Sequence, residues 1–591
     1  MSRILLLCHG FNSLSQRVFG ELRAAGHEVS VELDVGDRVT EEAVELFRPE
    51  LVVAPFLKRK IPASVWERVP CLIVHPGPPG DRGPSALDRA VLEGQQAWGV
   101  TVLQATGDFD AGPVWAHESF PLRAAAKGSL YRREVAEAAV ACTLRAVERF
   151  AQGQGPLPTQ SEASRGWRPL VQSDERRIDW AHDTAATVLA KLNSADGQPG
   201  VPDSLFGVDC HLHDPHPASA RLIAGLPPSA PGTLLGHRDG ALLRRTVDGA
   251  VWIGQARHPG VCGGAPAFKL PCTLAFPEQA AALLEWPVPL ERQDDEAGDG
   301  EWSEISYREL GPPGARVGCL SFDFCNGAMS TGQCRRLLAA LHEARRRDTR
   351  VLLMMGGADF FSNGIHLNCI EAAAHRPGDS AADESLRNIE AMDDLALAWI
   401  TTTDRLTVSV LRGNAGAGGA FLALAADEVW AHRGVVLNPH YKNMGNLYGS
   451  EYWTYLLPRR LGEQGAAALM NRRLPVGAVE AEALGLIDRC FDLPAQAFGP
   501  AATTHALALA ASHNVGDRIA LKQRRRATDE AVRPLAAYRQ DELSRMHRNF
   551  YGFDPSYHVA RYHFVHKLPH AWTPRHLALH REPAGQPKAT P

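Results

Sequence analysis

The sequence predicts a multidomain α/β protein, with a Rossmann-like N-terminal domain, a small β barrel, and a C-terminal α/β domain that ends in a helical tail. Its 591 residues exceed the usual domain size of about 100–200. Short apolar segments alternate with longer amphipathic ones in residues 3–150 and 316–426, which is typical of strands and helices around a parallel sheet. Between these regions, short strand-like segments are separated by Gly, Asp and Pro, which favours a β barrel.

The N-terminal domain is predicted at residues 1–160. We expect strands at Ile4–Cys8, Glu28–Leu33, Leu51–Pro55, Cys71–His75 and Val100–Gln104, and helices at Ser15–Ala25, Glu41–Leu46 and Tyr131–Gln152. Parallel sheets of this kind bind ligands beyond the carboxyl ends of their strands. His75 and the Gly107–Gly112 loop are therefore expected to face one crevice.

Four further segments complete the predicted organisation. They are a β-barrel domain at 161–290, an acidic linker at 291–302, an α/β core at 303–505 and a helical tail at 506–591. In the α/β core we expect strands at Arg316–Phe322, Arg350–Met355 and Leu406–Leu411, and helices at Thr331–Arg347, Asn388–Thr402 and Gly418–Ala426. The linker prediction follows from its acidic, Gly-containing and aperiodic composition.

Composition narrows the classes of function. The net charge of −5 gives no field that would attract nucleic acid or an anionic membrane. No apolar run approaches the roughly 18 residues that span a bilayer, so we expect a cytoplasmic protein. The 11 cysteines contain no CxxC pair, which favours reduced thiols. The histidines of the His211–His216 stretch have no matching ligands nearby, and no metal site is expected.

The N-terminal domain contains ordered motifs that are similar to those of one enzyme family. They are Val74-His75-Pro76-Gly77, Arg82-Gly83-Pro84-Ser85, Gly99-Val100-Thr101-Val102 and Asp108-Phe109-Asp110-Ala111-Gly112. Their order resembles the active-site segments of formyltransferases that use N10-formyltetrahydrofolate. Arg177–Trp180 and Pro231–Leu234 extend the resemblance into that family's OB-like C-terminal domain, which implies an OB-like barrel here.

This resemblance implies a set of site residues. It implies catalytic roles for His75 and Asp110, and a folate-binding role for Phe56, Leu57, Gln104 and Asp110. The family has an Asn two residues before the His, but Ile73 stands at that position. A thiol is a strong nucleophile once ionised, so a thiol acceptor is considered in place of the usual amine.

The C-terminal α/β core carries a second pair of motifs. The stretches Gly356–Leu367 and Arg412–Ala420 resemble two loops of the crotonase (enoyl-CoA hydratase/isomerase) superfamily. The resemblance implies that the N–H groups of Asn363 and Gly418 form an oxyanion hole for a thioester. It also suggests that Ala417, Arg561 and Lys567 bind coenzyme A.

The departures from the crotonase pattern are informative. Phe421 and His440 stand where hydratases have two glutamates, so ordinary hydration is not expected. The loop from Asn438 to Tyr452 instead contains several ionisable side chains. We expect Tyr441 and Glu451 to be the acid/base pair, with His440 and Tyr448 as alternatives.

Together, the two halves are similar to hydrogenase maturation factors of the HypX (HoxX) family. That resemblance implies formyl transfer from N10-formyltetrahydrofolate to coenzyme A, followed by decarbonylation of formyl-CoA to supply carbon monoxide to NiFe hydrogenase. NiFe hydrogenase maturation proteins are candidate partners, with no nucleic acid or membrane. Two alternatives stay open. One is a formyltransferase joined to an independent acyl-CoA hydrolase or isomerase, and the other is a binding scaffold that has lost catalysis, as Ile73 and Phe421 suggest.

Overall fold

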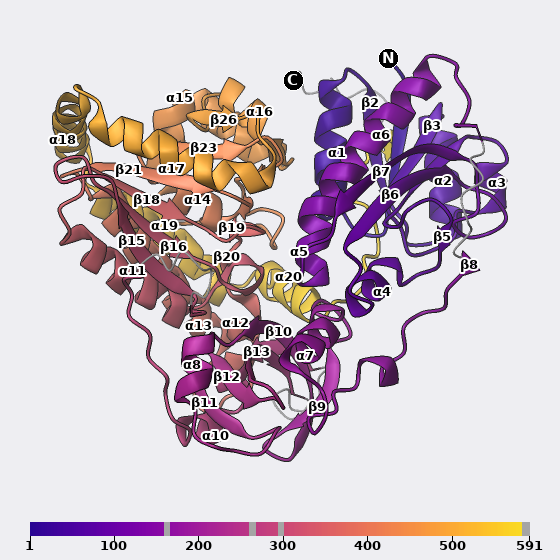
Figure 1. The fold of residues 1–591 in the computed structure, drawn as a ribbon. Coiled ribbons are helices and arrows are strands. Elements are labelled where there is room, and N and C mark those ends of the chain that lie inside the picture. The colour runs from indigo at the N-terminus through magenta and orange to yellow at the C-terminus, as the bar shows by residue number, and fades with distance from the viewer. Residues whose placement is uncertain (159–165, 259–266, 293–300, 582–591) are drawn as a thin grey trace. The chain divides into compact units, whose positions relative to one another are not determined.

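A computed structural model describes residues 1–158, 166–258, 267–292 and 301–581. Its contacts divide the chain into two compact units. Unit 1 comprises residues 1–177, 190–199 and 568–591, and unit 2 comprises 178–189 and 200–567. Figure 1 shows the ribbon of each unit, coloured along the chain. The predicted acidic linker falls mainly on residues 293–300, which lie outside the described residues.

A six-stranded sheet in the order β2-β1-β3-β4-β6-β7 forms the centre of unit 1. Its strands are β1 (Arg3–Cys8), β2 (Glu28–Leu33), β3 (Leu51–Phe56), β4 (Cys71–His75), β6 (Ala97–Gln104) and β7 (Val114–Pro121). The first four in this order are parallel, as expected for apolar strands buried on both faces. The predicted parallel arrangement does not extend to β6, which pairs antiparallel with β4, or to β7, a strand that was not predicted and that pairs antiparallel with β6. The direct connection from β6 to β7 permits this without a crossover helix.

Helices of unit 1 pack against the sheet and one another (Figure 1). They include α1 (Ser13–Ala24), α2 (Asp37–Phe47), α4 (Ala86–Leu92) and α6 (Ala136–Ala151). Asn12 begins α1, because its side-chain oxygen accepts a hydrogen bond from the Ser15 N–H at 3.0 Å, the usual N-cap arrangement. The helix predicted from Tyr131 begins with a π-helical turn before it continues as α6.

The last described residues of the chain belong to unit 1, where they cover the edge strand β2. The Val31 N–H donates to the Leu577 carbonyl at 2.9 Å. Glu32 is fully buried and accepts hydrogen bonds from His580 and Arg581, each at 2.8 Å. Pairing of this kind protects an edge strand from association with other chains.

The first part of unit 2 is an antiparallel sheet in the order β11-β12-β13-β10-β9, with β14 paired to β13. The strands are β9 (Val201–Leu205), β10 (Val208–Pro217), β11 (Leu234–Arg238), β12 (Ala241–Arg245), β13 (Ala250–Arg257) and β14 (Lys269–Pro271). All of these pairs are antiparallel. This is the region in which short strands separated by turn residues are expected.

The second part of unit 2 contains the sheet β15-β16-β18-β21-β23-β26 and the smaller sheet β19-β22-β24-β25. The larger comprises β15 (Ile305–Leu310), β16 (Val317–Phe322), β18 (Val351–Met355), β21 (Leu406–Leu411), β23 (Glu428–His432) and β26 (Arg489–Phe491). The smaller comprises β19 (Phe360–Ser362), β22 (Asn414–Gly416), β24 (Val436–Asn438) and β25 (Val476–Gly477). In the larger sheet, β16, β18, β21, β23 and β26 are parallel to one another.

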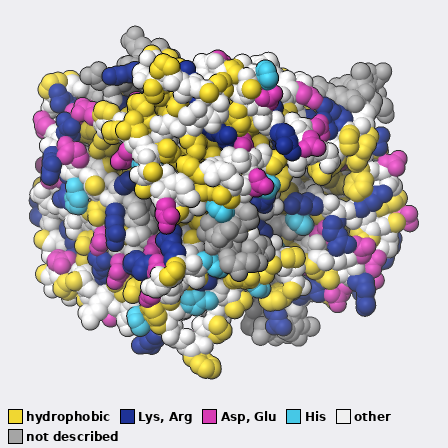
Figure 2. Space-filling model, turned by 90° about the horizontal axis from the view of Figure 1, so that it is seen from below, with side chains coloured by type: hydrophobic (Ala, Val, Ile, Leu, Met, Phe, Trp, Pro, Cys, Tyr) yellow, Lys and Arg dark blue, Asp and Glu magenta, His cyan; other side chains and the backbone are white. Residues whose placement is uncertain are grey.

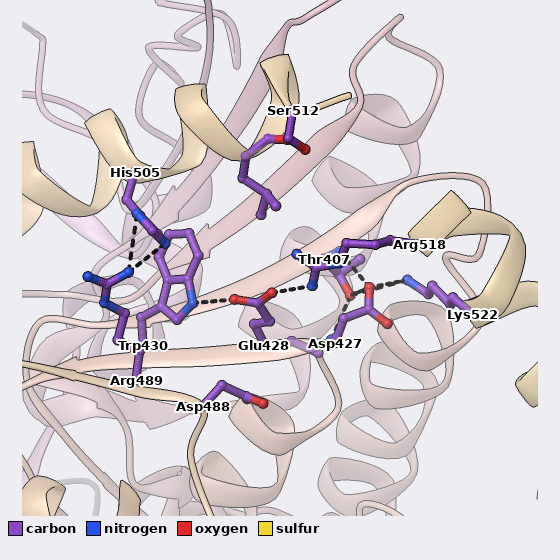
Figure 3. Close-up of polar contacts among 12 residues, drawn as sticks. Thr407, Asp427, Glu428, Trp430, Asp488, Arg489, His505, Ser512, Arg518 and Lys522 are labelled. Atoms are coloured by element: carbon purple, nitrogen blue, oxygen red, sulfur yellow. Dashed lines mark hydrogen bonds and ion pairs between the residues drawn. The ribbon is translucent and has the colours of Figure 1, made fainter. Parts of the chain in front are cut away.

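Helices surround these two sheets. They include α11 (Thr331–Arg345), α13 (Ala381–Ile400), α14 (Gly418–Leu424), α15 (Trp453–Arg472), α17 (Ala495–Ala511), α18 (Val515–Val532), α19 (Leu535–Tyr551) and α20 (Ser556–Val565). Figure 3 shows polar contacts of α18 with β23 and with Asp427 directly before it, and a contact of His505 on α17 with Arg489 on β26. Lys522 on α18 donates to Asp427 at 2.6 Å, and Arg518 pairs with Glu428, which also accepts from the Trp430 indole.

Side chains of both charges lie on the surface. Figure 2 shows one face of the molecule, on which basic and acidic side chains are interspersed. Among the described residues, no helix combines the length and the hydropathy that a membrane span requires. The ten cysteines in the described ranges are free thiols. The same ranges contain no group of three or more His, Cys, Asp or Glu side chains arranged to hold a metal ion.

Two candidate active sites

The first candidate site lies at the carboxyl end of β4, in unit 1, where His75 is almost fully buried. Two carboxylates face the two nitrogens of its imidazole ring. His75 Nδ1 lies 3.5 Å from Asp110 Oδ1, and His75 Nε2 lies 3.0 Å from Asp81 Oδ2. The structure therefore brings the predicted pair together and adds a second acidic partner.

Asp110 reaches His75 because the loop between β6 and β7 returns toward the end of β4. Asp110 itself has a left-handed backbone, with φ of +51°, which Asp adopts more readily than most residues. The Gly83 N–H donates to Asp110 Oδ2 at 3.1 Å. One carboxylate oxygen is thus fixed by the backbone while the other faces the imidazole.

Asp81 is the residue of this site that the sequence-based analysis missed. It is 2% exposed, and its Oδ1 has no hydrogen-bond partner among the described residues. A Cβ at Gly77 would fall 2.5 Å from His75 Nε2 and 2.6 Å from Asp81 Oδ2, so only Gly permits this close approach. The available signal was an acidic residue directly before Arg82, at a motif position to which the formyltransferase resemblance assigns no role.

The predicted folate-binding residues lie at different places around the sheet. Phe56 ends β3, next to β4 in the sheet, and its ring lies 6.2 Å from that of Tyr131. Leu57 follows and packs against the core. Gln104 pairs with Leu72, three residues before His75, and its side chain accepts a hydrogen bond from the Trp115 indole. The structure therefore places Phe56 near the His75 end of the sheet, and Gln104 farther along it.

The second candidate site is a cavity of about 350 Å³ in unit 2. It is lined by residues of the β22–α14 turn, the loop that follows β24, and side chains of α13 and α19. Six residues that the sequence singled out line it together: Asn363, Ala417, Gly418, His440, Tyr441 and Glu451. Most of the remaining lining residues are apolar, which is typical of a ligand pocket with a few polar groups.

Glu451 and Tyr441 form the buried polar pair of this cavity. The Tyr441 hydroxyl donates to Glu451 Oε2 at 2.5 Å, and it also lies 2.9 Å from the Ser450 carbonyl oxygen. Burial, together with the negative charge of Asp393, raises the pKa of Glu451. The Tyr441 ring stacks on Phe421 with centroids 5.3 Å apart. Phe421 therefore fixes the phenol that contacts the Glu451 carboxyl.

Of the two N–H groups predicted to form the oxyanion hole, one already has a backbone partner in the structure. Gly418 is the first residue of α14, where helical N–H groups have no partner within the helix, and a Cβ there would fall 2.3 Å from Glu451 Oε1. The Asn363 N–H, by contrast, donates to the Gly327 carbonyl at 2.7 Å. This bond corrects the expectation of two open donors, because the backbone itself occupies one of them. Gly418 is the predicted oxyanion-hole residue that lies against the Glu451 carboxyl.

The three residues predicted to bind coenzyme A have different surroundings in the structure. Ala417, with φ of +47°, lines the cavity. The prediction for Arg561 is corrected, because its guanidinium is 7% exposed and forms two 2.9 Å contacts with Glu371. Lys567 is exposed, and its Nζ lies 4.2 Å from the centroid of the Phe564 ring, which lines the cavity.

The structure also locates the two alternative acid/base residues. His440 lines the cavity. Tyr448 packs against Trp453, with centroids 5.3 Å apart, and against the Arg545 guanidinium. Tyr441 and Glu451 therefore remain the polar pair that meets in the cavity.

Two buried carboxyls behind Glu451 were also missed. Asp393 on α13 and Glu542 on α19 are both fully buried. The sequence signal was weak, since a single acidic residue in an amphipathic helix usually belongs to its solvated face.

Comparisons with known proteins agree with the family resemblances of both halves of the chain. A formyl transferase family model matches residues 22–147, and an enoyl-CoA hydratase/isomerase model matches residues 325–575. The chain is 55% identical over 584 residues to the hydrogenase maturation factor HoxX of Bradyrhizobium diazoefficiens, covering 98% of this chain and 97% of that protein. A methionyl-tRNA formyltransferase of Legionella pneumophila is 25% identical over 40% of this chain and 75% of its own. The crystal structure of HypX from Aquifex aeolicus in complex with tetrahydrofolic acid has a TM-score of 0.91 and 44% identity, covering 99% of this chain and 100% of that chain.

Proposed function

Because the chain belongs to the HoxX and HypX family of hydrogenase maturation factors, we propose that it makes carbon monoxide in two steps. Unit 1 transfers the formyl group of N10-formyltetrahydrofolate to the thiol of coenzyme A. Unit 2 then cleaves formyl-CoA to carbon monoxide and coenzyme A. The product is a ligand for the active site of NiFe hydrogenase, with NiFe hydrogenase maturation proteins as partners in the cytoplasm.

The first step takes place at His75. The thiol sulfur attacks the formyl carbon, the carbon–N10 bond breaks, and N10 of the folate takes up the proton. An ordinary thiol has a pKa of about 8.5, so a neighbouring base that accepts its proton assists the attack. The contact of 3.5 Å between His75 Nδ1 and Asp110 Oδ1 orients the imidazole for this proton transfer. Tetrahydrofolic acid in the Aquifex aeolicus relative supports folate as the donor.

The second step takes place at Glu451. The carboxylate removes the formyl proton, the carbon–sulfur bond breaks, carbon monoxide leaves, and the thiolate is reprotonated through Tyr441 and Glu451. The overall balance is formyl-CoA to carbon monoxide and coenzyme A, with no other reactant. The Gly418 N–H, at the positive end of the α14 dipole, holds the carbonyl oxygen.

One observation carries the proposal for unit 2. The Gly418 turn that lines the cavity resembles the thioester-binding turn of crotonases, whereas Phe421 stands where that resemblance expects a hydratase glutamate, and the Tyr441–Glu451 pair lies beside the turn. Adding water across a double bond with two glutamates is therefore not the chemistry that this cavity supports. The cavity instead favours the removal of one proton by a single buried carboxylate.

The test is an assay of the purified full chain with N10-formyltetrahydrofolate, with and without coenzyme A, in a sealed vial. Haemoglobin absorbance reports carbon monoxide. The proposal expects carbon monoxide that depends on coenzyme A and disappears in His75→Ala. Accumulation of formyl-CoA without carbon monoxide would favour a formyltransferase joined to a separate thioester activity. No turnover of folate would favour a non-catalytic scaffold.

A further inference from the structure

The backbone that carries Glu451 is unusual. Glu451 and Tyr452 are consecutive non-glycine residues with left-handed conformations, with φ of +59° and +60°. Such residues cost free energy and persist where the surrounding structure holds them. The two residues form the turn directly before α15, and this turn directs the Glu451 carboxyl toward Tyr441 and Gly418.

Two buried carboxyls from different helices hold this turn. Asp393 Oδ1 on α13 accepts hydrogen bonds from the Ser450 hydroxyl at 2.7 Å and from the Glu451 N–H at 2.8 Å. Glu542 on α19 accepts from the N–H groups of Tyr452 and Thr454, each at 2.9 Å. Glu542 thus caps the N-terminus of α15, where N–H groups need an acceptor.

We propose that Asp393 and Glu542 are positioning residues for the Glu451 carboxyl: they hold the strained turn that carries it, and Asp393 also places a negative charge beside it. This role rests on the proposed function of Glu451. Neither carboxyl lines the cavity, so both act through the turn rather than on a substrate. Burying two extra carboxyls beside a third is costly, and the geometry of the turn explains why the fold contains them.

Charge from several elements acts on Glu451. The titratable groups that face it are Tyr441 and His440 from the loop after β24, Asp393 from α13, Glu542 and Arg539 from α19, and Cys334 from α11. After burial, the charge of Asp393 contributes most to the raised pKa of Glu451. Arg539 lies beside this carboxyl, with its Nε 3.8 Å from Asp393 Oδ2, and its positive charge favours the ionised form of Asp393. Its Nη1 pairs with Asp394 at 2.7 Å.

The effect of the Asp393 charge on Glu451 is tested by infrared titration of the full-length protein. The carbonyl stretch of protonated Glu451 is assigned by its absence in Glu451→Gln. Asp393→Asn keeps an oxygen acceptor for the Glu451 N–H but removes the negative charge, so we expect the titration midpoint of Glu451 to fall to lower pH. Asp394→Asn is the matched control, because Asp394 is the next residue on α13, is half exposed and pairs with the same arginine. In Asp394→Asn we expect the titration midpoint of Glu451 to stay at the wild-type value.

The geometry is tested by hydrogen exchange of the backbone amides of residues 450–454. We expect faster exchange in Asp393→Ala and Glu542→Ala, and near-wild-type protection in Asp393→Asn. Carbon monoxide release should fall about 10²-fold in Asp393→Ala, the effect of a misplaced catalytic group. If the alanine variants do not fold, Asp393→Asn and Glu542→Gln decide the question.

The outcomes separate this inference from the function on which it rests. An unmoved Glu451 midpoint in Asp393→Asn, or unchanged exchange in the alanine variants, would overturn the positioning roles. Failure of the wild-type protein to release carbon monoxide would overturn the proposed function instead. The infrared and exchange measurements need no turnover, so they decide the positioning roles in either case.

Discussion

Removing the hydroxyl of Tyr441 isolates its contribution to the second site. In Tyr441→Phe the ring keeps its stack on Phe421, while Glu451 loses a hydrogen bond of 2.5 Å. A hydrogen bond to a charged group contributes about 1.5–3 kcal/mol. Since one pKa unit corresponds to about 1.4 kcal/mol, the loss should raise the pKa of Glu451 by about one to two units.

The sign of the resulting change follows from the proposed role of Glu451 as the base that removes the formyl proton. Because the ionised carboxylate removes the formyl proton, a higher pKa leaves less of the active form at neutral pH. We expect carbon monoxide release at neutral pH to fall about 10- to 100-fold, and the ascending limb of its pH profile to move to higher pH. Asp393→Asn should move the same limb to lower pH, because it removes a negative charge near Glu451.

The assay is the initial rate of carbon monoxide release from formyl-CoA across a pH series, followed by haemoglobin absorbance. Circular dichroism and thermal unfolding of the same preparations check that Tyr441→Phe folds as the wild type does. A wild-type rate with an unmoved limb would refute the reasoning, since it would show that the hydroxyl neither stabilises the carboxylate nor shuttles a proton.

Three further predictions address other parts of the chain. Asp81→Asn removes the carboxylate beside His75 Nε2 and should slow formyl transfer by about tenfold or more, while carbon monoxide release from supplied formyl-CoA is unchanged; equal loss of both activities would contradict this assignment. Gly418→Ala places a Cβ 2.3 Å from Glu451 Oε1 and should abolish carbon monoxide release without affecting folate turnover, which is measured as tetrahydrofolate formed. Lys522→Met leaves the partly buried Asp427 carboxylate without its cation and should lower the free energy of unfolding by about 1–3 kcal/mol, measured by urea denaturation; a change below the error of that measurement would show that this ion pair does not help hold α18.

Much of the fold could be predicted from the sequence because its strands are short apolar runs. Glu28–Leu33 and Cys71–His75 are strands with the predicted bounds. The direction of β6 and β7 could not be predicted in this way, because alternation of strands and helices does not specify which strands run antiparallel. The return of residues 568–581 to β2 also depends on contacts with residues more than 500 positions away, which leave no local pattern.

Sequence motifs predicted which of the candidate site residues lie close together. His75, Asp110, Gly418, Tyr441 and Glu451 all lie at the two sites that their motifs indicate. Residues that act through long-range contacts were missed or misassigned. The partner of Arg561 is 190 residues away, so its sequence neighbourhood could not distinguish a buried ion pair from a phosphate-binding side chain.

The positioning carboxyls were hidden for a related reason. Asp393 and Glu542 lie in helices whose patterns predict only that acidic residues face water. Their importance follows from the left-handed turn at Glu451, and no sequence pattern marks a non-glycine residue that adopts this conformation.

The most direct test of the central claim supplies formyl-CoA, isotopically labelled at the formyl carbon, to the full-length wild-type protein, His75→Ala and Glu451→Gln, and measures labelled carbon monoxide in the headspace. The account predicts equal release from the wild type and His75→Ala, because the labelled substrate bypasses the first site, and no release from Glu451→Gln. Release from Glu451→Gln at the wild-type rate, or its loss in His75→Ala, would contradict the division of the reaction between the two sites.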